Sequence, residues 1–264
     1  MAELALWAYC VARAADPVPE GLPGVDGEHP VERVEHGGLA ALVSAVPLED
    51  YGEQALRRNL NDFPWLERVA LGHEAVLEHA LAATTIVPLR LCTIFDDEAG
   101  VRERLDAQHD AFAEALDALA GREEWSVKLL VDSAALEAAA GGPPAEPAEP
   151  EGSGAAYLLG RRRERDAREQ ADRVAGELAE EVHTTLREAA ADAVIGRPQN
   201  PELSGHEGEM LLNVAYLVER GQVERLRALV GELGERHRER GARLELSGPL
   251  PPYNFVPRPQ EAPA

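Results

Sequence analysis

The sequence predicts an α+β protein built from two domains. Its 264 residues exceed one domain of ordinary size and suffice for two. The stretch Gly141–Gly154 is rich in Pro, Glu and Gly and has no large apolar residue, which is typical of an extended, solvated linker. On both sides of it, short strand-like runs alternate with longer stretches of helical periodicity. The predicted parts are residues 1–124 for an N-terminal α+β domain, 125–140 for a strand and a helical turn of the second domain, 141–154 for the linker, 155–256 for the C-terminal domain with its closing tail, and 257–264 for a disordered end.

The first domain is expected to begin with a strand at Leu4–Val11. A hairpin should follow, with strands at Val31–Glu35 and Leu39–Val46. Its turn is Gly37-Gly38, and two glycines permit the positive φ angles that a tight hairpin turn needs.

A long helix is predicted to start near Asp62, whose side chain suits an N-cap. Its apolar face recurs at helical spacing and includes His73, which we interpret as a buried residue that bonds to a neighbouring strand. Thr84–Phe95 is β-branched and apolar, which indicates a strand that Pro88 breaks or bulges. Asp96–Ala120 reads as one further helix.

The second domain has the element order β-α-β-β-α-β when the strand before the linker is counted first, and this order predicts a ferredoxin-like domain. One helix is long and amphipathic, and its apolar stripe recurs every three or four residues. Ala155–Leu159 is either a short strand or the entry to that helix. The predicted strands are Trp125–Val131, Asp192–Gly196, Met210–Val218 and Leu244–Leu246, and the predicted helices are Arg161–Ala191 and Glu219–Gly241.

The tail Gly248–Phe255, with the sequence GPLPPYNF, contains three prolines. Proline fixes φ and removes a backbone donor, so we expect a stiff, extended segment that is neither helical nor central in a sheet. One interpretation is a structural clamp, in which Tyr253 and Phe255 lie against the last strand or the first domain. The other is an exposed segment that grips a partner.

Composition excludes several classes of protein. The formal net charge of -22 disfavours nucleic acid and anionic membrane surfaces as partners. Residues 1–140 hold 26 acidic and 10 basic residues, so the charge is concentrated in the first part. No apolar run approaches the ~20 residues of a membrane span. Glu3 stands where a secretion signal would be basic, and Cys10 and Cys92 read as two buried thiols, which favours a reducing cytoplasm.

Catalytic patterns are weak. His73-Glu74 suggests a zinc protease, but the second histidine, His79, comes six residues on instead of four and so points elsewhere. Lys128 is the only lysine, and a strand lysine that faces water or pairs with Glu123 or Glu124 accounts for it better than a Schiff base does. The arginines from Arg161 onward are interpreted as a salt-bridged helix face, with partner docking as the functional alternative. We expect no catalytic, cofactor or metal site.

Seven segments, in one order from about residue 4 to residue 256, carry a common pattern. They are Gly37–Ser44, Trp65-Leu66 with His73, Val87–Arg90 through Thr93–Phe95, Glu124–Lys128, Tyr157–Leu159 with the arginines after it, Asn213–Val218, and the tail. Together these segments resemble the gas vesicle protein GvpL/GvpF family, and the tail resembles the family signature Gly-Pro-Trp-Pro-Pro-Tyr-Asn-Phe. Leu250 stands where the family usually has Trp, and Leu91-Cys92 where it usually has Phe-Gly.

The resemblance implies a cytoplasmic, non-enzymatic accessory protein of gas vesicle formation. Such a protein would bind the small hydrophobic shell protein and other vesicle proteins, and it could associate with the vesicle. An enzyme with an unrecognised cleft between its domains is the alternative, and nucleic-acid binding ranks third. The candidate structural or partner-contact residues are Trp65, Arg90, Trp125, Lys128, Arg161, Arg162, Tyr216, Pro252, Tyr253, Asn254 and Phe255.

Overall fold

The computed structural model describes residues 3–139, 154–197 and 208–256. The chain divides into two compact units, one formed by the residues up to Arg122 together with those from Leu250 onward, and the other by Glu123–Pro249. The sequence predicts the tail as part of the second domain, whereas the structure groups its residues from Leu250 onward with the first unit. The predicted linker lies almost wholly outside the described residues.

The first unit is built on a sheet whose central strand is β1 (Leu4–Arg13). The strand order is β2-β3-β1-β4, and β5 also pairs with β1. All the pairings of β1 are antiparallel. Gly37 and Gly38, with φ angles of 58° and 82°, form the turn between β2 and β3, which confirms the predicted hairpin. The other strands are β2 (Val31–His36), β3 (Leu39–Pro47), β4 (Val87–Pro88) and β5 (Ile94–Phe95).

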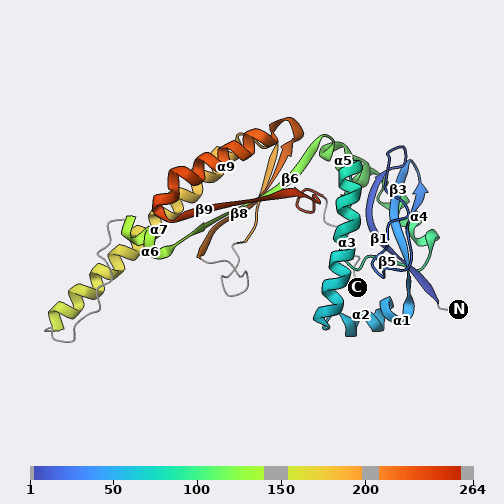
Figure 1. Ribbon diagram of the computed structural model, residues 1–264, viewed down its shortest axis with the longest axis horizontal. Coiled ribbons are helices and arrows are strands. Elements are labelled where there is room, and N and C mark those ends of the chain that lie inside the picture. The colour runs from blue at the N-terminus through green and yellow to red at the C-terminus, as the bar shows by residue number, and fades with distance from the viewer. Residues whose placement is uncertain (1–2, 140–153, 198–207, 257–264) are drawn as a thin grey trace. The chain divides into compact units, whose positions relative to one another are not determined.

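Helices cover both faces of this sheet. In Figure 1, α3 (Phe63–Ala83) and α4 (Glu98–Ala107) lie on opposite sides of it, while α5 (His109–Leu119) contacts β1 and β4. Two short helices, α1 (Leu48–Tyr51) and α2 (Glu53–Asn59), connect β3 to α3. Because neither face is left to water, β1 is buried almost continuously instead of at alternate residues.

Two predicted elements of the first unit are wrong in detail. The predicted helix Asp96–Ala120 is two helices, because Gln108 leaves the helical conformation and caps α5. The imidazole of His109, the first residue of α5, hydrogen-bonds to the carbonyl of Gly37 at 3.0 Å, which holds this break against the hairpin turn. The predicted strand Thr84–Phe95 pairs only at its two ends, in β4 and β5, and the residues between them form a loop.

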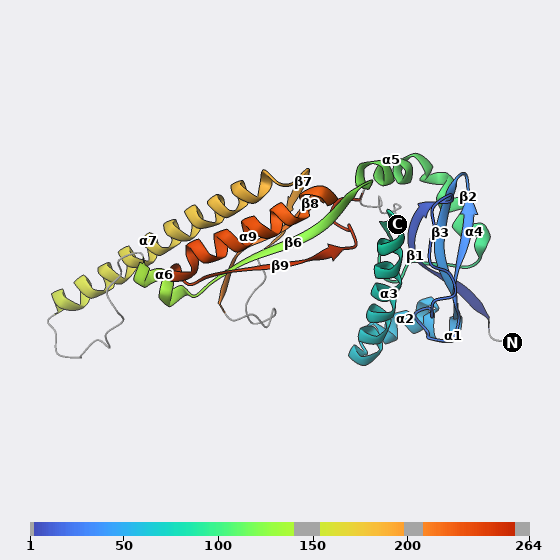
Figure 2. The same ribbon diagram turned by 45° about the horizontal axis from the view of Figure 1, so that its top comes forward.

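The second unit has a four-stranded sheet in the order β7-β8-β6-β9, with α7 and α9 on one face (Figure 2). The elements follow the predicted β-α-β-β-α-β order, and a short helix, α6, is added after β6. Ala155–Leu159 belongs to α7 and is helical. The bounds are β6 (Arg122–Val131), α6 (Ser133–Ala139), α7 (Gly154–Arg187), β7 (Asp192–Ile195), β8 (Glu209–Glu219), α9 (Val223–His237) and β9 (Ala242–Leu250).

The core of the second unit follows strand alternation. Every second residue of β6 from Trp125 to Val131 is buried against the two helices, and every second residue of β8 from Leu212 to Val218 joins them. The stripe predicted for the long helix contributes Leu178, Val182 and Leu186. These residues form one apolar cluster, which fixes which face of the sheet the helices cover.

Cys92 in the loop between β4 and β5 has a φ of 65°, in the left-handed region, where a side chain costs about 1–2 kcal/mol. We therefore expect Cys92→Gly to be more stable than Cys92→Ala by about 1 kcal/mol. Both changes remove the half-buried thiol, so their difference in urea unfolding reports the backbone alone. If the two variants were equally stable, the positive φ would not explain why the family usually has Gly at this position.

Candidate functional site

The tail packs into the first unit through its two adjacent prolines. Pro251 and Pro252 are buried, although Pro249 before them is exposed. Backbone hydrogen bonds from Tyr253 N to Pro251 O and from Phe255 N to Pro252 O, 2.7 and 3.2 Å long, fold the end of the tail into tight turns. The prediction of an extended segment is therefore wrong for Pro251–Phe255, while Gly248–Leu250 end the edge strand β9, where proline is tolerated.

A buried histidine receives the tail. His73 on α3 is 1% exposed, and its Nδ1 accepts a hydrogen bond of 3.0 Å from Trp7 Nε1 on β1. In the neutral ring Nε2 must then carry the proton. That nitrogen lies 3.2 Å from the Tyr253 hydroxyl and 3.3 Å from the carbonyl oxygen of Leu89. Tyr253 in turn donates to the same carbonyl oxygen at 3.3 Å, which closes a triangle of polar groups. We call Pro251–Phe255 on this triangle the tail clamp.

Aromatic rings surround the imidazole. Tyr9 stacks on His73 with a centroid separation of 5.4 Å, and Trp7 meets both His73 and Tyr51 edge to face. The Tyr9 hydroxyl accepts a hydrogen bond from Val25 N at 2.9 Å and lies 2.6 Å from the Ser44 hydroxyl. This buried hydroxyl therefore has two hydrogen-bond partners. These contacts hold the imidazole in one orientation.

Burial determines the protonation of the site. It lowers the pKa of His73 to about 4, and the hydrogen bond to Leu89 opposes that shift only in part. Burial, followed by the charge of Glu74, raises the pKa of Tyr253. Both groups are therefore neutral near pH 7, so Nδ1 of His73 is free to accept from Trp7 while Nε2 meets the Tyr253 hydroxyl of the tail.

The zinc-protease pattern is not assembled. His79 bonds through Nδ1 to the carbonyl of Ala75, one turn back on its own helix, while His73 faces the core. Within the described ranges, no group of three histidine, cysteine, aspartate or glutamate side chains is placed to hold a metal ion.

Three of the candidate residues are core residues. Trp65 packs against Tyr51 with ring centroids 5.5 Å apart. Trp125 has its Nε1 3.2 Å from Glu123 and carries the guanidinium of Arg227 over its ring at 4.7 Å. The buried Tyr216 meets His183 Nδ1 with its hydroxyl at 3.0 Å. Trp65 belongs to the core of the first unit, and Trp125 and Tyr216 belong to the core of the second.

The remaining candidates, apart from Pro252, are at least partly exposed, and they are spread over several elements. Lys128 is half-buried on β6, and Arg90 lies exposed in the loop after β4. Arg161 and Arg162 are exposed on α7, where Arg162 pairs with Asp166. In the tail, Pro252 is buried, Tyr253 is 36% exposed, Asn254 is exposed and Phe255 is half-buried. The structure gathers only the tail residues into one site.

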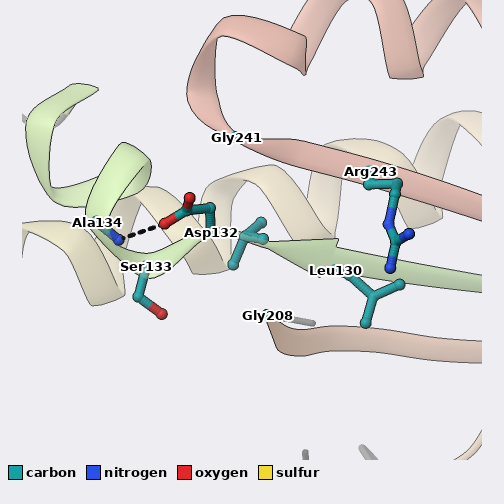
Figure 3. Close-up of a pocket in the computed structure, with 8 residues that line it drawn as sticks. Leu130, Asp132, Ser133, Ala134, Gly208, Gly241 and Arg243 are labelled. Carbon is teal, nitrogen blue, oxygen red and sulfur yellow. Dashed lines mark hydrogen bonds between the residues drawn. The ribbon is translucent and has the colours of Figure 1, made fainter. Parts of the chain in front are cut away.

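A recess opens in the second unit where β6 ends, and Figure 3 shows its lining. Its polar groups already have partners. Asp132 accepts hydrogen bonds from the backbone of Ala134 and Ala135 at the start of α6, Ser133 lies 3.4 Å from Glu209, and Arg243 pairs with Glu245 at 3.0 Å. Its lining residues include the Ser133 hydroxyl and the Asp132 carboxylate but no imidazole.

The sequence reasoning missed an apolar surface on α3. Phe63 and Leu71 are 74% and 66% exposed, and Leu60 just before the helix is 45% exposed. The signal was present in the sequence, because Phe63 and Leu71 are large apolar residues that fall outside the inward-facing stripe of the predicted helix.

Fold and site together define a two-unit α+β protein whose polar centre binds its own tail. The family model described as gas vesicle synthesis protein GvpL/GvpF matches residues 5–257. The chain is 39% identical over 251 residues to gas vesicle protein L of Streptomyces sp. (strain CB03234), covering 95% of this chain and 92% of that protein. It is also 31% identical over 270 residues to gas vesicle protein F of the same strain, with 96% and 100% covered.

A solved structure has the same fold. The crystal structure of the gas vesicle protein GvpF from Anabaena sp. PCC7120 superposes with a TM-score of 0.70 at 22% identity, covering 99% of both chains. The chain belongs to the GvpL/GvpF family of gas vesicle synthesis proteins, as the resemblance predicts. Among the described residues, no helix is both long and apolar enough to cross a membrane.

For the tail clamp, we expect Tyr253→Phe to lower the free energy of unfolding by about 1 kcal/mol, because it removes the hydroxyl that bonds to both His73 and the Leu89 carbonyl in a partly buried triangle. Truncation after Leu250, which leaves β9 complete, should lower it by a few kcal/mol through the additional loss of two buried prolines and Phe255. Urea unfolding measures both. The clamp would be refuted if the truncated chain kept the midpoint of the full chain, as an independent recognition segment would.

The depressed pKa of His73 predicts a pH effect on stability. Folding favours the neutral imidazole, so this contribution is complete above pH 6.5 and is lost as the pH falls toward 4. Its full size is roughly 3 kcal/mol. We expect the free energy of unfolding of the natural chain to fall more steeply over this range than that of His73→Gln, which cannot take up the proton. Parallel curves would mean that His73 does not govern this transition.

Proposed function

We propose that this chain acts in gas vesicle formation by binding, without catalysis, the small hydrophobic shell protein and other proteins of vesicle assembly. Membership of the GvpL/GvpF family supports a role in gas vesicle formation. The observation that carries the mode of action is the exposed apolar surface of α3, since large apolar side chains gathered on one helix are typical of a protein-binding surface.

The physical basis is mass action. A shell subunit with uncovered apolar faces aggregates, and a partner that covers those faces lowers the concentration of the aggregating species. The strong negative charge of this chain keeps the complex in solution through repulsion between copies. In this proposal the chain works in the cytoplasm, in contact with the growing vesicle, and needs no cofactor.

Co-expression of the tagged chain with the shell protein tests the proposal. We expect the shell protein to be recovered with the chain in the soluble fraction and to precipitate when an unrelated acidic protein of similar charge replaces it. Light scattering after dilution of denatured shell protein should likewise be lower with this chain than with the unrelated acidic protein. If the shell protein precipitates equally in both cases, the chain is not its holding partner.

A further inference from the structure

One face of α3 combines exposed apolar residues with unpaired carboxylates. Its members follow one another at spacings of four, four, three and four residues along the helix. At about 100° per residue they fall within a sector of about 80°, so their side chains form one continuous surface. The opposite side of α3 faces the core through Trp65, Val69 and His73. We call this surface the α3 stripe, and it consists of Phe63, Glu67, Leu71, Glu74 and Glu78.

The apolar members have no role in the first unit. Phe63 and Leu71 leave most of their surface in water, so neither stabilises the fold appreciably. Burying either one against a partner would contribute about 1.5–3 kcal/mol. They stand two helical turns apart, which is the anchor spacing with which one helix contacts another along its length.

The charged members are unfavourable in the isolated chain. None of the three carboxylates forms an ion pair with a described residue. Glu74 and Glu78 are four residues apart, where like charges repel. Burial raises the pKa of Glu74, and the charge of Glu78 raises it further. The arginine and histidines of this helix, Arg68, His73 and His79, lie off the stripe. A cation from outside would therefore relieve a repulsion that the fold itself leaves in place.

We propose that the α3 stripe binds an amphipathic helix of a partner protein that carries apolar residues about two turns apart, with Lys or Arg beside them. The apolar anchors would cover Phe63 and Leu71, while the basic side chains would neutralise the carboxylates. This inference rests on the proposed function, in which the shell subunit supplies the helix.

A second copy of the chain is the competing occupant, because α7 carries exposed arginines. Three of those arginines are already engaged within α7, since Arg162 pairs with Asp166, Arg165 with Glu169 and Arg173 with Glu177. The stripe cannot pair with itself, because its carboxylates would then face each other. Charge complementarity therefore favours a foreign basic helix.

The test uses the full-length chain co-expressed with the shell subunit, with recovery measured per mole of chain at about 50 mM and about 500 mM salt. Phe63→Ser combined with Leu71→Ser should lower recovery at least about tenfold. The triple change Glu67→Gln, Glu74→Gln and Glu78→Gln should lower recovery at low salt and abolish its salt dependence. Matched controls are Ile195→Ser, which replaces another exposed apolar residue, and the triple change Glu103→Gln, Glu114→Gln and Glu232→Gln.

Stability separates binding from a structural role. Removing the Glu74–Glu78 repulsion should leave the unfolding midpoint of the glutamine triple variant unchanged or raised, while its binding falls. A lowered midpoint together with lowered binding would mean that the carboxylates serve the fold, and would overturn the inference.

Other outcomes distinguish the two proposals. If the natural chain recovers the shell subunit and both stripe variants do so equally well, the stripe is not the docking surface, although the proposed function stands. If the natural chain recovers none, the proposed function fails and the inference falls with it. If the stripe variants instead change the sedimentation of the chain alone, the occupant is a second copy and the foreign helix is refuted.

Discussion

The first unit depends on keeping one imidazole neutral and fully hydrogen-bonded. His73 joins the central strand through Trp7, the loop after β4 through Leu89, and the tail through Tyr253. Each bond requires the same tautomer, because Nδ1 must accept and Nε2 must donate. An unsatisfied nitrogen here would cost more than the net gain of an ordinary hydrogen bond, since the ring has no access to water. The position of the tail therefore follows from the protonation state of a residue on α3.

Periodicity made much of the fold predictable from the sequence. The hairpin at Gly37-Gly38 and the stripe of α7 come from local rules that the structure obeys, because only one face of each element can be buried. The break at Gln108 and the shortness of β4 and β5 escaped prediction. They depend on contacts distant in sequence, such as the bond between His109 and Gly37. No local pattern encodes such a contact.

The sites divide in a similar way. Burial of His73 was predictable, because its place in an apolar stripe indicated the interior. Its link to Tyr253, 180 residues away, was not predictable. Trp65, Trp125 and Tyr216, which lie in three of the segments that share the resemblance, are interior residues that preserve the fold. The α3 stripe belongs to no recognised motif, although the helical periodicity already places Phe63 and Leu71 outside the inward-facing stripe, and their exposure in the structure agrees with that placement.

The first unit is discontinuous in sequence, since Glu123–Pro249 intervenes between its main part and Leu250. During synthesis, the residues that complete the surroundings of His73 leave the ribosome after the whole second unit. The second unit is one uninterrupted segment, so its core can form earlier. Until Tyr253 is made, the Nε2 donor of His73 in the first unit lacks its tyrosine partner. Residues made after the second unit thus complete the first, and a ribosome that stops before Tyr253 releases a first unit in which His73 lacks that hydrogen-bond partner.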